Sequence, residues 1–128
     1  MSTNNTTRPT ESELEILQVL WAKGPGTVRQ VNEELNKKRP IGYTTSLKLM
    51  QIMTSKGLLR RNTEQKTHIY HPAIKKEEIQ QQLLDRLLDS AFGGSAQKLV
   101  MQALGNHKAS KSELEEIKKL INEMEQKK

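Results

Sequence analysis

The spacing of apolar residues predicts three helices and a β-hairpin in the first part of the chain. Apolar positions recur at helical intervals over 10–23, 27–37 and 44–56, and Gly57 provides a stop for the third segment. Thr10 with Glu13 and Thr27 with Gln30 have the spacing of capping boxes, which predicts helix starts. Two short alternating runs, 58–61 and 67–70, flank a polar tip and predict the hairpin.

After Pro72 the pattern changes to three amphipathic helices. They are predicted over 75–92, from Ala96 to about Leu104, and from a capping box at Ser110 and Glu113 onward. Short helices with few aromatic residues bury their apolar faces poorly alone, so we expect this part to pair with a second copy. The residues expected in that interface are Leu83, Leu84, Leu87, Leu88, Phe92, Leu99, Val100, Ile117, Ile121 and Met124.

The order of these elements predicts a mainly α fold with a small β-hairpin wing. We expect a flexible arm over 1–9, a winged helix-turn-helix DNA-binding domain over 10–73, and a three-helix dimerisation domain over 74–128.

Composition narrows the function. Hydrophobic residues make up 34% of the chain and aromatic residues 3%, which is thin for a self-sufficient core and favours a homodimer. There is no cysteine, so disulfides and cysteine-ligated metal sites are excluded. No apolar run approaches the roughly 20 residues that span a bilayer, and the polar start lacks a signal segment, so we expect a cytoplasmic protein without membrane insertion.

The positive charge is concentrated in the first part of the chain. Residues 1–72 hold eleven Lys and Arg against six acidic residues, whereas residues 73–128 hold ten against nine. This asymmetry favours a polyanionic partner for the first part, with nucleic acid ahead of a membrane surface.

The third helix has the side chains of a helix that enters the major groove. A helical projection places Thr44, Lys48 and Gln51 on the outward side, with Thr45 beside them. Ser46, Leu49, Met50 and Met53 lie on the inward side. Any surface helix can have a polar outer face, and Leu47, between the two faces, could meet a thymine methyl group or complete the core.

The hairpin has basic residues on both sides of its tip. Arg60 and Arg61 precede the tip and Lys66 follows it, which suits contacts to phosphates beside the groove, although a solvated turn would have the same residues.

The sequence offers no metal site, cofactor motif or catalytic motif. His68 and His71 flank two apolar residues and His107 lies in another segment, so the three histidines do not form a ligand set. We expect His68 to pack in its strand and His71 to face solvent or phosphate. No nucleophile elbow or glycine-rich phosphate loop is present, and we expect no enzyme activity.

Three segments resemble the family of penicillinase and methicillin-resistance repressors. They are ELEILQVLW at 13–21, KGLLRR at 56–61 with IYHP at 69–72, and FGGSAQKLV at 92–100; the segment 110–121 is also similar to the last helix of that family. The resemblance covers nearly all of the chain from Thr10 onward.

This resemblance implies a homodimeric repressor that reads palindromic operator DNA and controls antibiotic-resistance or stress genes. It also implies release by a membrane-bound sensor with a protease domain, which cuts such repressors in the fifth helix between Asn and Phe. Gln102 and Ala103 occupy the matching positions here. The chain also differs where the family often has basic residues, at Thr44, Leu47 and Ile52, so we expect a different operator sequence.

A helical adaptor that binds protein rather than DNA is the alternative. In that case the leucine-rich C-terminal part would be the active region. The two hypotheses differ in the salt dependence of binding to duplex DNA.

Overall fold

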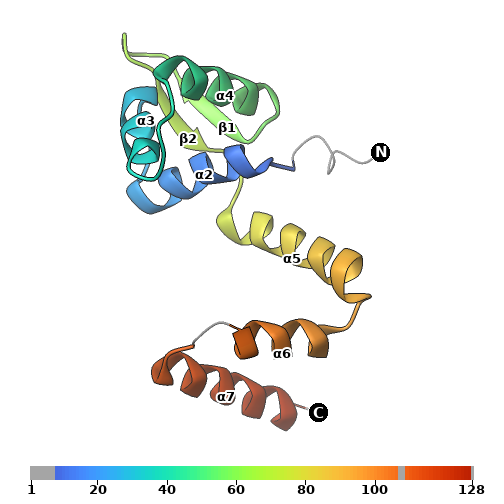
Figure 1. Ribbon diagram of the computed structural model, residues 1–128. Helices are drawn as coiled ribbons and strands as arrows, with labels where there is room; N and C mark the ends of the chain where they lie inside the picture. The colour runs from blue at the N-terminus through green and yellow to red at the C-terminus, as the bar shows by residue number, and fades with distance from the viewer. Residues whose placement is uncertain (1–7, 107–108, 128) are drawn as a thin grey trace. The chain divides into compact units, whose positions relative to one another are not determined.

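The computed structural model describes residues 8–106 and 109–127, and in these it contains six α-helices and one antiparallel hairpin (Figure 1). This confirms the predicted mainly α class with a β-hairpin. Residues 1–7 of the expected arm, and His107, lie outside the described residues, whereas Pro9 is buried. The elements are α2 (Glu11–Lys23), α3 (Val28–Asn36), α4 (Tyr43–Ser55), β1 (Leu59–Asn62), β2 (Ile69–Pro72), α5 (Lys76–Phe92), α6 (Ala96–Asn106) and α7 (Lys111–Gln126).

Three of the helices begin with the capping boxes that the sequence predicts. Before α3, for example, the amide of Gln30 donates to Thr27 Oγ1 at 3.1 Å and the amide of Thr27 donates to Gln30 Oε1 at 2.9 Å. The same reciprocal pair opens α2 and α7. Each box satisfies two amides that a helix start otherwise leaves without a partner, which is why the starts are so readable in the sequence.

The loop at the tip of the hairpin is longer than the sequence predicts. The strand β2 starts at Ile69, which pairs with Asn62, so residues 63–68 lie outside the ladder. The amide of Glu64 donates to Asn62 Oδ1 at 2.9 Å, and this local bond replaces cross-strand pairing. His68 is therefore exposed before the strand, and its predicted strand packing was wrong.

A third short segment pairs with β2. Tyr70 donates its amide to the carbonyl of Gly26 at 2.8 Å and accepts from the amide of Gly26 at 3.1 Å. A Cβ at position 26 would lie 2.9 Å from Oε1 of Gln30, the atom that caps α3, so glycine fits here without displacing the cap. This bridge fixes the hairpin against the turn between α2 and α3.

The helices α2, α3 and α4 and the hairpin enclose one apolar core. The side chains that are almost completely buried in it include Ile16, Leu17, Val31, Met50, Met53, Leu58 and Tyr70. Met50 and Met53 confirm the inward side of α4, and Leu49 beside them is half-buried. The core therefore fixes which face of α4 remains in solvent.

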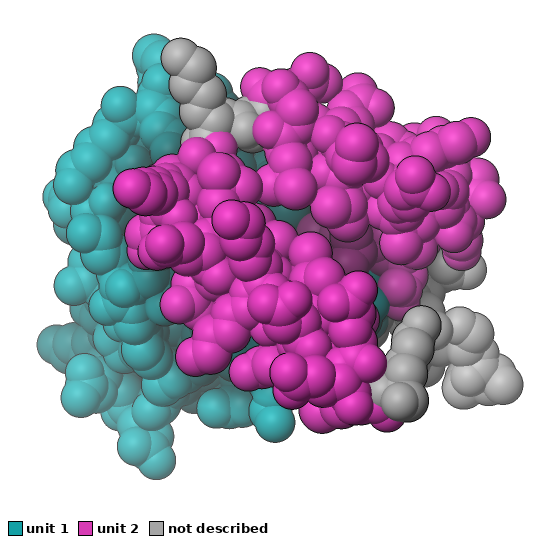
Figure 2. Space-filling model, turned by 90° about the horizontal axis from the view of Figure 1, so that it is seen from below, with its two compact units in different colours: residues 1–82 teal, residues 83–128 magenta. Residues whose placement is uncertain are grey.

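The chain divides into two compact units, Met1–Gln82 and Leu83–Lys128 (Figure 2). The division lies within α5, beyond the boundary at 73/74 that the change of pattern suggested. Ile79, in the first turn of α5, belongs to the first unit and is completely buried.

The second unit has a different character. Of its described residues, none in α6 or α7 is buried, and the pairs of elements that pack closely all lie within the first unit. No helix among the residues described in either unit is long and apolar enough to cross a membrane.

Candidate nucleic-acid interface

The outward face of α4 is polar and exposed. Thr44, Thr45, Lys48 and Gln51 are all exposed, as the sequence predicts. Helical spacing aligns Thr44, Lys48 and Gln51 along one side, opposite the buried methionines. Hydroxyl, amide and ammonium groups of this size can reach the edges of bases in a major groove.

Two asparagines hold α3 against the start of α4. Asn32 Nδ2 donates to the carbonyl of Ile41 at 3.0 Å and to Ser46 Oγ at 2.9 Å, and Ser46 is completely buried. Asn36 Nδ2 donates to the same carbonyl at 2.9 Å, and Asn36 Oδ1 accepts from the amide of Ile41 at 3.2 Å. These bonds fix the turn that sets the direction of α4.

Sequence reasoning missed this pair. Asparagine favours helix ends and turns over helix interiors. Two asparagines spaced i, i+4 within a helix therefore indicate side chains that bond to a neighbouring segment.

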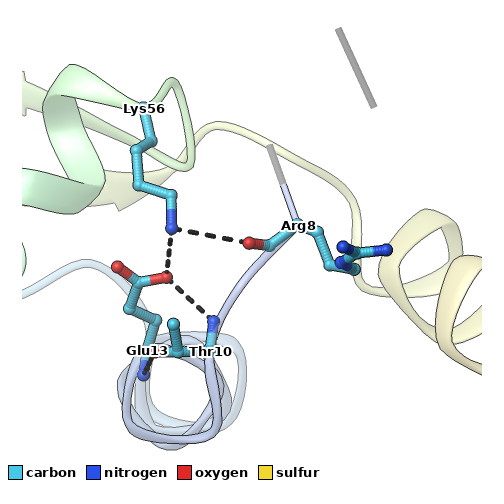
Figure 3. A network of polar contacts seen from close by, with 4 residues as sticks. All are labelled: Arg8, Thr10, Glu13 and Lys56. Carbon is cyan, nitrogen blue, oxygen red and sulfur yellow. Dashed lines mark hydrogen bonds and ion pairs between the residues drawn. The ribbon is translucent and has the colours of Figure 1, made fainter. Parts of the chain in front are cut away.

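The far end of α4 is held by a buried ion pair (Figure 3). Lys56 Nζ lies 2.6 Å from Glu13 Oε1, and the side chain of Glu13 is only 4% exposed. The same carboxylate oxygen accepts from the amide of Thr10 at 2.9 Å, and Lys56 donates to the carbonyl of Arg8 at 3.4 Å. Glu13 thus caps α2 and also holds Lys56 at the end of α4. Through this one carboxylate, the start of the first unit is joined to the candidate interface.

The hairpin separates its two arginines. Arg60 pairs with His71 across the ladder and Arg61 pairs with Tyr70, and both arginines are exposed. Successive side chains of a strand point to opposite faces. Arg61 therefore shares a face with the buried Tyr70, on the side that packs on the helices, whereas Arg60 lies on the other face with His71. Lys66 is exposed at the tip.

Basic residues of the first unit differ in whether they form ion pairs. Lys37, Arg39 and Lys56 form ion pairs with Glu34, Glu15 and Glu13. In the part of the chain that the structure describes, Lys48, Arg60, Arg61 and Lys66 form no ion pair. Their positive charge is uncompensated by a neighbouring carboxylate and is available to an anion.

An aromatic residue precedes the polar face. Tyr43 is the first residue of α4, and the guanidinium of Arg29 from α3 lies over its ring, 5.8 Å from the centroid. Sequence reasoning did not select either residue, since neither belongs to a local motif and only the fold brings them together.

One carboxyl in this unit has a displaced pKa. The hydrogen bond from Lys37 lowers the pKa of Glu34, and the charges of Lys23 and Lys37 act in the same direction. This pair lies on α3 and at its C-terminal end, not on the polar face of α4.

The predicted interface residues of the second unit lie on all three of its helices. Exposed side chains are Leu84, Leu87, Val100, Ile121 and Met124, and half-buried ones are Leu83, Leu88, Phe92, Leu99 and Ile117. Gln102 and Ala103 are exposed within α6. Further exposed apolar residues that the prediction did not select are Met101, Leu104, Leu114 and Leu120.

No group of three or more histidine or acidic side chains that could hold a metal occurs within residues 8–106 and 109–127.

Comparison with known proteins identifies similar sequences along almost the whole chain. The model of the penicillinase repressor family matches residues 9–123. The transcriptional regulator BlaI of Mycobacterium tuberculosis is 27% identical over 93% of this chain and 86% of its own length. The methicillin resistance regulatory protein MecI of Staphylococcus aureus is 20% identical, over 93% and 97%. The penicillinase repressor of Bacillus licheniformis is 23% identical, over 88% of each chain.

Proposed function

Because the chain belongs to the penicillinase repressor family, a family of transcriptional repressors and not of enzymes, we propose that it represses transcription by binding palindromic operator DNA as a homodimer. The observation that carries this proposal is the outward face of α4, which combines polar side chains with a lysine that forms no ion pair among the described residues. Its site of action is then the bacterial cytoplasm, where the operator lies.

The face of α4 supplies the base readout. Thr44, Lys48 and Gln51 present hydroxyl, ammonium and amide groups along one side of a helix whose other side is fixed in the core. Thr45 extends this face. Because the helix is held rigidly, these groups lose little conformational entropy on binding. This favours specific hydrogen bonds to bases over non-specific electrostatic attraction to phosphates.

The hairpin supplies contacts to phosphate. We assign the stronger phosphate contact to Arg61, because it lies on the face of the hairpin that packs on the helices. Arg60 lies on the opposite face, and we assign it a weaker phosphate contact. Lys66 extends the positive charge to the tip. Phosphate contacts of this kind fix register on the duplex without reading sequence.

The second unit supplies the dimer contact. Its helices expose large apolar side chains that no other element of the described chain covers closely, for instance Leu87 on α5, Val100 on α6 and Ile121 on α7. Burying such side chains against a second copy removes apolar surface from water and contributes roughly 25 cal/mol for each Å². A dimer also presents two reading helices, as a palindromic operator requires.

We propose the regulated genes from the names of the relatives, and the release mechanism from the resemblance of the chain to their family. Relatives of this chain are named for penicillinase and methicillin resistance, and we assign antibiotic-resistance or stress genes to this repressor. Release by a sensor protease would require a cut between Gln102 and Ala103, both exposed on α6. Incubation with the activated sensor, followed by mass spectrometry of the fragments, tests that bond; an intact chain after derepression would refute proteolysis there.

Footprinting with the full chain on the DNA upstream of its own gene tests the central proposal. The expected result is a protected palindrome whose binding weakens steeply between about 50 and 200 mM salt. Lys48→Ala and Arg61→Ala should each flatten the slope of log affinity against log salt by about one unit, and Arg60→Ala should flatten it less. Salt-independent binding, or no protected site on any duplex, would favour the helical adaptor instead.

A further inference from the structure

Two large apolar side chains of the first unit are exposed, among the residues described there, and both belong to α4. They are Tyr43, at 47%, and Ile52, at 43%. Tyr43 has a partner, since Arg29 lies over its ring. Ile52 is an aliphatic side chain without a ring or a hydrogen-bonding group, and a single exposed apolar residue elsewhere would need no explanation.

The position of Ile52 distinguishes it from an incidental surface residue. It lies one helical turn after Lys48 and two turns after Thr45, so it borders the polar face of α4. Lys48 is exposed and forms no ion pair within the described chain. If this face bound an apolar protein surface, the charge of Lys48 would be buried without a partner, which is unfavourable. If it bound DNA, a phosphate would neutralise that charge.

We propose that Ile52 contacts the C5-methyl group of a thymine in the operator, and so makes thymine a required base at one position of each half-site. This rests on the proposed repressor function. Ile52 has no hydrogen-bonding group, and the thymine methyl is the apolar group that the major groove presents. Its β-branched side chain holds a fixed rotamer in a helix and offers a rigid surface to that methyl. Leu47, for which the sequence left this contact open, is half-buried.

Removing the methyl group from DNA tests the contact directly. An operator is first selected from a random duplex library by the full-length chain. Each thymine of the half-site is then replaced by deoxyuridine, which removes only the methyl. At one position the wild-type chain should lose affinity about fourfold, and roughly 15-fold when both half-sites are changed together. Ile52→Ala should bind the thymine and deoxyuridine duplexes equally well.

Lys48→Ala provides the matched control on the same face. It should bind every duplex more weakly and still show the fourfold penalty for deoxyuridine. Thermal melting of Ile52→Ala should match that of the wild type, which excludes unfolding as the cause.

The outcomes separate this inference from the proposal on which it rests. A selected half-site without thymine, a flat response to deoxyuridine, or an unchanged penalty in Ile52→Ala would each overturn the methyl contact while leaving the repressor function standing. A library that yields no enriched sequence would overturn both.

Discussion

The first unit is built around its own core, whereas the second exposes its apolar residues. In the first unit, α2, α3, α4 and the hairpin bury side chains such as Leu17 and Met50 completely. In the described part of α6 and α7 no residue is buried, and Leu120 and Met124 are 55% and 59% exposed. Both units contain helices that begin with capping boxes, so the units differ in packing although they share this local signal.

The difference indicates that the helices of the two units are packed to different degrees. Helix starts in both are specified locally, but most helical stability in proteins comes from packing an amphipathic face. The first unit finds that packing within one chain. For the second we propose that a second copy provides it, so its stability should depend on protein concentration.

The largest effect should come from placing charge on the apolar face of α5. Leu87→Lys together with Leu88→Lys should give a monomer, because two ammonium groups cannot be buried in an apolar interface without partners. Loss of the second reading head should weaken operator binding by about 10²–10⁴-fold. Sedimentation and fluorescence anisotropy measure the two effects. A variant that remains dimeric would refute this interface.

Within the first unit, loss of Lys56 should be more damaging than loss of Asn32 or of the cap at Thr27. Lys56→Met leaves the buried carboxylate of Glu13 without its cation and should destabilise the unit by about 2 kcal/mol, less than for a fully buried pair because Lys56 is 26% exposed. Urea unfolding of the full chain measures this. Adding Glu13→Gln should recover part of the loss, and a double variant no more stable than the single one would contradict the account.

Asn32→Ala should cost the first unit about 1–2 kcal/mol. The change removes two hydrogen bonds and leaves the completely buried hydroxyl of Ser46 without its donor. Asn36→Ala is the matched control, since Asn36 is exposed and water can replace its bonds. Unfolding free energies of the two variants should therefore differ, and equal losses would argue against the role of burial.

Equivalent caps in the two units should respond differently to concentration. Thr27→Ala and Ser110→Ala each remove a capping box and should cost about 1 kcal/mol. The melting temperature of the unit altered by Thr27→Ala should be independent of protein concentration, whereas that of the unit altered by Ser110→Ala should fall on dilution, since we propose that α7 is stable only in the dimer. Calorimetry over a 100-fold range of roughly micromolar concentrations measures this; parallel behaviour would remove the distinction between the units.

The smallest effect concerns the surface pair of Glu34 and Lys37. Because the bond from Lys37 lowers the pKa of Glu34, the pair contributes stability above the ordinary carboxyl pKa and loses it as the pH falls through the lowered value. Lys37→Met should raise the pKa of Glu34 toward its ordinary value in an NMR titration, with little change in folding because exposed pairs contribute little. An unchanged pKa would show that Lys37 is not its cause.

Local chemistry made much of the fold predictable from sequence. The capping boxes, the stop at Gly57 and the inward face of α4 each depend on residues within a few positions of one another, so their spacing is visible in the chain. The start of β2 was less predictable, because Asn62 forms a local side-chain bond to the amide of Glu64 within the loop before it.

Local patterns in the chain specify the order of the elements, the capped helix starts and the set of polar residues on the outward face of α4. Packing between elements sets how that face is held and bordered: the hydrogen bonds of Asn32 and Asn36, the ion pair of Lys56 with Glu13, and the opposite faces of Arg60 and Arg61. These join residues up to 43 positions apart. The physical reason is that periodicity reports which residues share a face of one element, whereas contacts between elements exist only after the chain has packed.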